Sequence, residues 1–230
     1  MYFCHTDEIW RDYPELVPGV LLIEGITKNA DVSSHVPKYY EIAESRLASN
    51  SEGELPEIQA WRRVFSRMGL KPTQYRCASE SLLRRFRKEK SLPQIHPLID
   101  LCNAISLAFA VPIAVFDTAK ITDHNEVRYA TGSETYLAFS GETENPDPGE
   151  VIFADRAARA HARRWTNRQS RYSVVEDGTT AVLIVAEAMH GSAPDDVEKL
   201  TAAIADDVNA AWSAPARTAM LSKSSPRFEF

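Results

Sequence analysis

The apolar segment at residues 98–117, LIDLCNAISLAFAVPIAVFD, constrains the fold of this chain more than any other stretch. Residues 98–110 are predominantly apolar over a helical length, which is typical of a helix buried inside a protein. Residues 111–117 follow as a short strand with a proline near its start, where a missing backbone N–H is tolerated. This pair predicts a sheet core that is flanked by helices.

The other segments extend this pattern to an α+β fold with a mixed sheet or sandwich core. We predict a buried strand at 19–26 and a capped amphipathic helix at 193–212. Because helices dominate the first half and strands the middle, regular β-α-β alternation is disfavoured. With no linker or repeat, we expect one domain over 1–230, with a frayed tail at 222–230. The remaining predicted elements are helices at 33–49, 55–69 and 78–90, and strands at 126–132, 135–141, 150–156, 171–176 and 179–189.

Composition and missing motifs exclude several classes of function. No run reaches the roughly 18 apolar residues of a membrane span, and the N-terminus lacks a secretory pattern, so we expect a cytoplasmic protein without a membrane partner. The three cysteines have no metal-ligand spacing. The sequence also lacks dinucleotide, P-loop, G-x-S-x-G and H-E-x-x-H signatures. We therefore expect neither a cofactor nor a metal.

Positive charge is concentrated in two regions although the net charge is −6. Residues 62–90 hold ten basic side chains against two acidic ones, and residues 156–171 hold six arginines and no acid. Such asymmetry is compatible with a phosphate backbone on one face, and equally with solvated helix surfaces.

The segment around residues 98–117 also carries a family resemblance. An acid is followed three residues later by an asparagine, then by an apolar helix and the motif P-x-x-x-F-D. This order resembles the B3/B4 editing module of the bacterial phenylalanyl-tRNA synthetase beta subunit. Freestanding B3/B4 proteins are more similar still, over roughly residues 15–210. The matching motif positions are Asp100, Asn103, Pro112, Phe116 and Asp117.

The resemblance implies hydrolysis of the ester between a wrongly attached amino acid and the 3′ end of a tRNA. A freestanding copy would act in trans on aminoacyl-tRNA, with no DNA partner. An aminoacyl ester is already activated, so a positioned water and donors aimed at the developing oxyanion could suffice without a metal or a protein nucleophile.

Carried over by position, the family's site maps only partly onto this chain. Asn103 corresponds to a pocket asparagine, although an amide capping a buried turn is the alternative. The synthetase histidine is replaced by Ala114. The glutamate that reads a tyrosine hydroxyl falls at Val185, with Glu187 two residues on and on the same strand face. We assign catalytic roles to Asn103, Glu187 and His96, the last as an orienter of water or ribose.

A glycine-rich turn of the synthetase pocket corresponds to ARRWTNR at residues 162–168, so amino acid selection is expected to differ. Freestanding relatives include deacylases of canavanyl-tRNA(Arg), whose substrate carries a planar cation suited to carboxylates. The stretch around Glu176 is equally a plain turn. The expected substrate-binding residues are Arg163, Trp165, Asn167, Gln169, Glu176, Asp177 and Asp117; those expected to bind tRNA are Arg84, Arg85, Arg87, Lys88, Arg156 and Arg159.

Three functional hypotheses follow from the sequence. The first is a trans-editing deacylase of mischarged tRNA, with canavanyl-tRNA(Arg) as its specific substrate. The second is a non-catalytic tRNA or RNA binder of the same fold, suggested by Ala114 and by the arginines in the turn. The third is a small-molecule amidase or binding protein without tRNA affinity.

Overall fold

The computed structural model describes residues 1–230 and contains two principal sheets. The larger has the strand order β12-β1-β4-β7-β8-β9, with β1 and β4 parallel and the other pairs antiparallel. The smaller is antiparallel and has the order β11-β2-β10-β3. The strands are β1 Tyr2–His5, β2 Val17–Glu24, β3 Ile113–Asp117, β4 His124–Tyr129, β5 Tyr136–Leu137, β6 Thr143–Glu144, β7 Val151–Ala154, β8 Ala160–Arg163, β9 Arg168–Gln169, β10 Ala181–Ala188, β11 Ala216–Met220 and β12 Arg227–Glu229.

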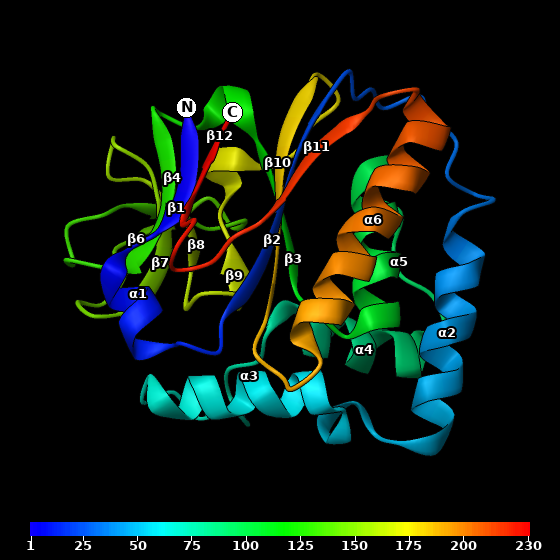
Figure 1. The fold of residues 1–230 in the computed structure, drawn as a ribbon, viewed down its shortest axis with the longest axis horizontal. Helices are drawn as coiled ribbons and strands as arrows, with labels where there is room; N and C mark the ends of the chain where they lie inside the picture. Colours follow the sequence, from blue (N-terminus) through cyan, green and yellow to red (C-terminus); the bar gives the residue numbers. More distant parts are fainter.

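Six α-helices accompany the sheets, so the predicted α+β class with a mixed sheet is confirmed. Figure 1 shows α2, α5 and α6 beside the four-stranded sheet, α3 below it, and the larger sheet on its other side. No helix has the length and apolar character needed to cross a membrane. The helices are α1 Asp7–Asp12, α2 Val36–Ser49, α3 Pro56–Arg67, α4 Ala78–Glu89, α5 Pro97–Phe109 and α6 Ala193–Trp212, with short 3-10 turns at Glu52–Glu54, Thr118–Lys120 and Arg171–Ser173.

Strand β10 separates two hydrophobic cores by the alternation of its side chains. Leu183 and Val185 belong to the core between the two sheets, whereas Val182 and Ile184 belong to the core under α5 and α6. Successive strand residues point to opposite faces, so Glu187 shares the face of Val185 and points toward the larger sheet. The predicted common face of Val185 and Glu187 is thereby confirmed.

Two predicted features of the chain are wrong. The segment at 171–176 forms a 3-10 turn rather than a strand, because the Ser170 hydroxyl accepts from the N–H of Tyr172 and caps that turn. The tail at 222–230 is not frayed, since β12 pairs antiparallel with β1 and Phe228 is only 9% exposed. An edge strand of the larger sheet therefore comes from the end of the chain.

The tail assignment can be tested by stability measurements. Phe228 packs in the core between the sheets, whereas Phe139 is 62% exposed. We expect Phe228→Ala to lower the free energy of unfolding in urea by about 2–3 kcal/mol. The control Phe139→Ala should change it by less than about 0.5 kcal/mol. Equal small effects would mean that the tail does not pack.

Candidate functional site

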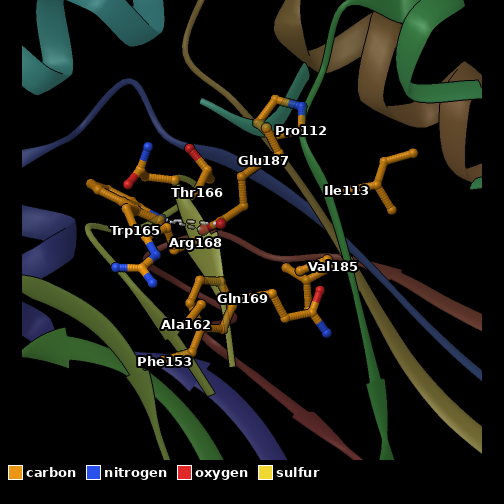
Figure 2. Close-up of a pocket in the computed structure, with 13 residues that line it drawn as sticks. Pro112, Ile113, Phe153, Ala162, Trp165, Thr166, Arg168, Gln169, Val185 and Glu187 are labelled. Atoms are coloured by element: carbon orange, nitrogen blue, oxygen red, sulfur yellow. Dashed lines mark hydrogen bonds between the residues drawn. The ribbon is translucent and has the colours of Figure 1, made fainter. Parts of the chain in front are cut away.

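A small cavity of about 50 Å³ lies between the two sheets, where β3 begins and β10 ends. The β8–β9 hairpin forms one wall (Figure 2). The first residue of α4 also belongs to the lining. This volume holds a few water molecules and is well below the roughly 150 Å³ that accommodates a benzene ring. The lining residues are Ala78, Pro112, Ile113, Ala114, Phe153, Ala162, Trp165, Thr166, Asn167, Arg168, Gln169, Val185 and Glu187.

The Glu187 carboxylate is the polar centre of the cavity. It is 2% exposed and lies 2.7 Å from His5 Nε2 on β1. The indole N–H of Trp165 donates to both carboxylate oxygens, at 3.0 and 3.1 Å, as the dashed lines in Figure 2 show. On α3, the indole N–H of Trp61 donates to the backbone oxygen of Glu187 at 3.2 Å. Three segments thus converge on one residue of β10, which fixes the carboxylate beside the cavity.

The β8–β9 hairpin has an unusual backbone for its sequence. Arg164 and Trp165 have φ angles of 48° and 57°, in the left-handed region that favours glycine. The turn is held by the Trp165 N–H, which donates to the Val151 oxygen at 2.7 Å, and by the Arg164 N–H, which donates to Glu150 at 2.8 Å. Bulky residues therefore occupy a glycine-like chain path here, and the Trp165 side chain is fully buried.

Several polar side chains of the hairpin face the cavity with different freedom to bind a ligand. Asn167 donates to the Arg76 oxygen at 2.7 Å, and Gln169 donates to the Val115 oxygen at 2.6 Å, so both also brace the hairpin. The buried Thr166 hydroxyl has no hydrogen-bond partner within the protein. The exposed Arg168 has a 3.4 Å contact with Glu144, and its guanidinium lies over the ring of Tyr136. Thr166 is thus the one of these four side chains that makes no hydrogen bond within the protein.

The structure brings part of the predicted site together. Trp165, Asn167, Gln169 and Glu187 all line the cavity. So do Ala114 and Val185, the positions that correspond by resemblance to the synthetase histidine and glutamate. These positions therefore lie in one cavity, although their residue types differ from those of the synthetase.

Two predicted catalytic residues lie elsewhere. Asn103 is half-buried on α5, whose apolar side chains pack mainly in the core on the opposite side of the four-stranded sheet. His96 caps the N-terminus of α5, where its Nδ1 accepts from the Leu98 N–H at 3.2 Å, and burial lowers its pKa. It lines a separate groove of about 760 Å³ between α2 and the segment before α5. Neither side chain belongs to the cavity lining. The four-stranded sheet lies between α5 and the cavity, and the capping contact holds His96 at the start of α5.

Four predicted substrate-binding residues have structural partners instead. Arg163 is 4% exposed and makes a two-point contact with Glu150 at 2.8 and 2.9 Å, which raises its pKa. Asp117, at the far end of β3, accepts from Thr179 at 2.7 Å. Glu176 and Asp177 precede β10 at the end remote from Glu187, and their exposed carboxylates pair with Lys120 at 2.8 Å and Lys28 at 2.6 Å. These lysines lower the pKa of both carboxyls. None of these four residues belongs to the cavity lining.

The predicted tRNA-binding residues differ in how free their charges are. Arg84 and Arg87 hold Glu52 at 3.1 and 2.7 Å, and Arg85 pairs with Glu89. The others are exposed: Lys88 has no carboxylate within 4 Å, Arg156 is 3.7 Å from Asp123, and Arg159 lies over the ring of Tyr172. Arg156 and Arg159 flank the β7–β8 turn, at the end of β8 away from the cavity.

Sequence reasoning missed three important residues. His5 contacts Glu187 across 182 positions of sequence, and no local pattern announces that pairing. Thr166 and Arg168 lie in the turn at residues 162–168. Only the alternation of side chains along the hairpin could have shown that they face the cavity whereas Arg163 does not. That alternation was hidden, because the left-handed residues of the turn have no glycine to mark them.

Comparisons with known proteins agree with the fold and with the cavity region. A family model described as the B3/4 domain matches residues 60–200. The phenylalanine–tRNA ligase beta subunit of Haemophilus influenzae is 25% identical over 118 residues, covering 51% of this chain and 15% of that protein. The same subunit of Bradyrhizobium diazoefficiens is 39% identical over 64 residues, covering 28% of this chain and 8% of that protein. The chain thus spans a small part of these relatives.

A solved structure supports the same fold over nearly the whole chain. An N-terminal fragment of the phenylalanyl-tRNA synthetase beta subunit from Pyrococcus horikoshii superimposes with a TM-score of 0.52. The match covers 94% of this chain and 50% of the fragment, at 12% sequence identity. At this identity the likeness concerns the fold.

The hydrogen bond between Trp165 and Glu187 can be weighed against a matched tryptophan. Trp10 is also buried, at 4% exposure, but its indole N–H has no acceptor. Both Trp→Phe changes remove similar volume, and only Trp165→Phe deprives the buried carboxylate of a donor. We expect Trp165→Phe to destabilise the protein by about 1–3 kcal/mol more than Trp10→Phe in urea unfolding. Equal losses would show that the contact contributes nothing beyond packing.

Proposed function

Because the chain belongs to the B3/4 domain family, we propose that it is a deacylase that hydrolyses the ester of mischarged aminoacyl-tRNA in trans. The observation that supports this most is the cavity, because its lining includes the hairpin together with Ala114 and Val185, the positions that correspond by resemblance to the synthetase histidine and glutamate. The family relation supports a tRNA-related role.

In the proposed reaction a water oxygen attacks the ester carbonyl, and the bond from that carbonyl carbon to the 3′ ribose oxygen breaks. The ribose oxygen takes up a proton, which releases the free amino acid and the tRNA. The unpartnered hydroxyl of Thr166 would orient the water, and the Arg168 guanidinium would stabilise the developing oxyanion or the terminal phosphate. Glu187 would contact the polar end of the amino acid.

The cavity size and its single carboxylate bear on the substrate. A space of about 50 Å³ suits a small aminoacyl side chain better than a phenylalanyl one. Canavanyl-tRNA(Arg) is the specific substrate that we propose on family grounds, with Glu187 as the partner of its cationic end. Such a substrate requires the cavity to open around Trp165, because a volume of about 50 Å³ is too small for its side chain. Glu176 and Asp177 pair with lysines elsewhere, so Glu187 is the carboxylate left for the cation.

For tRNA phosphates we propose Arg168 beside the cavity and Lys88 at the far end of α4, with Arg156 and Arg159 as more distant contacts. The exposed Lys88 has no carboxylate within 4 Å, and the carboxylate contacts of Arg168 and Arg156 are long, at 3.4 and 3.7 Å, which supports the assignment. Arg84, Arg85 and Arg87 pair with carboxylates at 2.7–3.1 Å. A protein that only binds tRNA would show salt-sensitive affinity and no turnover.

The proposed activity is tested by incubation with a panel of aminoacyl-tRNAs that includes canavanyl-tRNA(Arg), alanyl-tRNA and phenylalanyl-tRNA. We expect one mischarged species to lose its ester well above the buffer rate. Ala114→Leu should fill the cavity and lower kcat/KM for it by at least about tenfold. The matched control Ala219→Leu changes a half-buried alanine on β11 outside the cavity lining and should have little effect. Absence of hydrolysis across the panel would overturn the proposal.

Thr166 gives a sharper test of the proposed chemistry. Thr166→Val keeps the side-chain shape and removes the hydroxyl. We expect kcat to fall about 10- to 100-fold with little change in KM, since a group that positions water acts on the chemical step. Thr166→Ser retains a hydroxyl and should restore most of the rate. An unchanged kcat in Thr166→Val would exclude a role for this hydroxyl.

A further inference from the structure

A second cluster of polar side chains lies where the N-termini of α3 and α6 meet. Glu57 is in the first turn of α3, His190 is in the loop between β10 and α6, and Asp196 is in the first turn of α6. One potential ligand atom from each lies within 4.8 Å of the other two. His190 Nε2 and Asp196 Oδ2 are 2.9 Å apart, and Ser192 donates to the same oxygen at 2.6 Å. None of these residues lines the cavity described above.

Two buried atoms of this cluster have no hydrogen-bond partner. They are Oε2 of Glu57, a residue that is 8% exposed, and Nδ1 of His190, which is 7% exposed. An unsatisfied buried polar atom costs free energy and calls for an explanation by an ion, a water or a function. Here both unpartnered atoms belong to residue types that ligate metals.

The local charge favours a dication. Arg46 donates to the other oxygen of Glu57, Oε1, at 2.6 Å and to the Ala108 oxygen at 2.8 Å. The carboxylates of Glu57 and Asp196 together with the Arg46 guanidinium carry a net charge of about −1. The partial positive charge of the two helix N-termini opposes a cation, and the carboxylates offset it.

We propose that Glu57, His190 and Asp196 bind one divalent transition metal ion of the zinc type, with water completing the coordination. Imidazole nitrogen and carboxylate oxygen are zinc ligands at about 2.0–2.2 Å, so tetrahedral ligand atoms stand about 3.3 Å apart. The observed separations need only small side-chain movements to reach that geometry.

The ion would fasten the β10–α6 loop to α3. Trp61 on the same helix already donates to the backbone of Glu187, three residues before His190. A metal at this point would therefore stabilise the end of β10 that carries Glu187. This inference does not depend on the proposed deacylase activity, since binding is measured directly.

The test is equilibrium dialysis of the full chain against Zn²⁺, with protein-bound zinc measured by atomic emission and Tm measured with and without the ion. We expect one zinc per chain and a higher Tm with zinc. His190→Gln and Glu57→Gln should each weaken zinc binding at least about tenfold and remove the zinc-dependent rise in Tm. If either fails to fold, Asp196→Asn, which changes a partly exposed side chain, replaces it.

His124→Gln provides the matched control. His124 also contacts an aspartate, Asp123, at 3.1 Å, but does not belong to a three-ligand cluster. Zinc binding should be unaffected by this change. The proposal would be overturned if the wild-type chain failed to bind zinc stoichiometrically. It would also be overturned if binding survived both His190→Gln and Glu57→Gln, in which case the half-buried thiol of Cys4 would be the next candidate ligand.

Discussion

The buried carboxylate of Glu187 is the interaction on which the candidate site depends. An ionisable group at 2% exposure is costly unless it is paired and hydrogen-bonded, and here His5 and Trp165 meet that requirement. Because these partners come from β1 and the β8–β9 hairpin while Trp61 binds the backbone from α3, one residue connects both sheets and a helix. The cavity exists beside this junction, where β10 faces the larger sheet.

The hairpin shows how a site can keep its chain path while its side chains change. Left-handed angles at Arg164 and Trp165 are disfavoured for side chains of this size, and the Glu150 contacts with Arg163 and the Arg164 N–H offset that cost. Trp165 then occupies space that glycines would leave open. The small cavity and the anchored carboxylate both depend on Trp165, and under the proposed function both would bear on which amino acid can enter.

The sequence predicted the parts of this protein that depend on local periodicity. The apolar run at 98–117 gave the buried α5 and β3, and alternation in β10 placed Val185 and Glu187 on one face. Partners distant in sequence were not accessible, because His5 and Glu187 meet only after β1 and β10 enter different sheets. Asn103 could not be placed from its motif alone, because the apolar side chains of the helix that carries it pack mainly on the far side of the sheet and Asn103 is not part of the cavity lining.

The claim that the ligand binds in the cavity beside Glu187 is tested most directly by NMR. The measurement is the shift of the indole N–H signals in ¹H–¹⁵N spectra when a non-hydrolysable aminoacyl-adenosine analogue is added. The chain has four tryptophans, and their signals can be assigned by single Trp→Phe changes. If the ligand enters the cavity beside Glu187, the Trp165 signal shifts on titration while that of Trp212, which donates to the Thr27 oxygen, stays in place. Saturable binding that leaves the Trp165 signal unmoved would contradict this placement of the site.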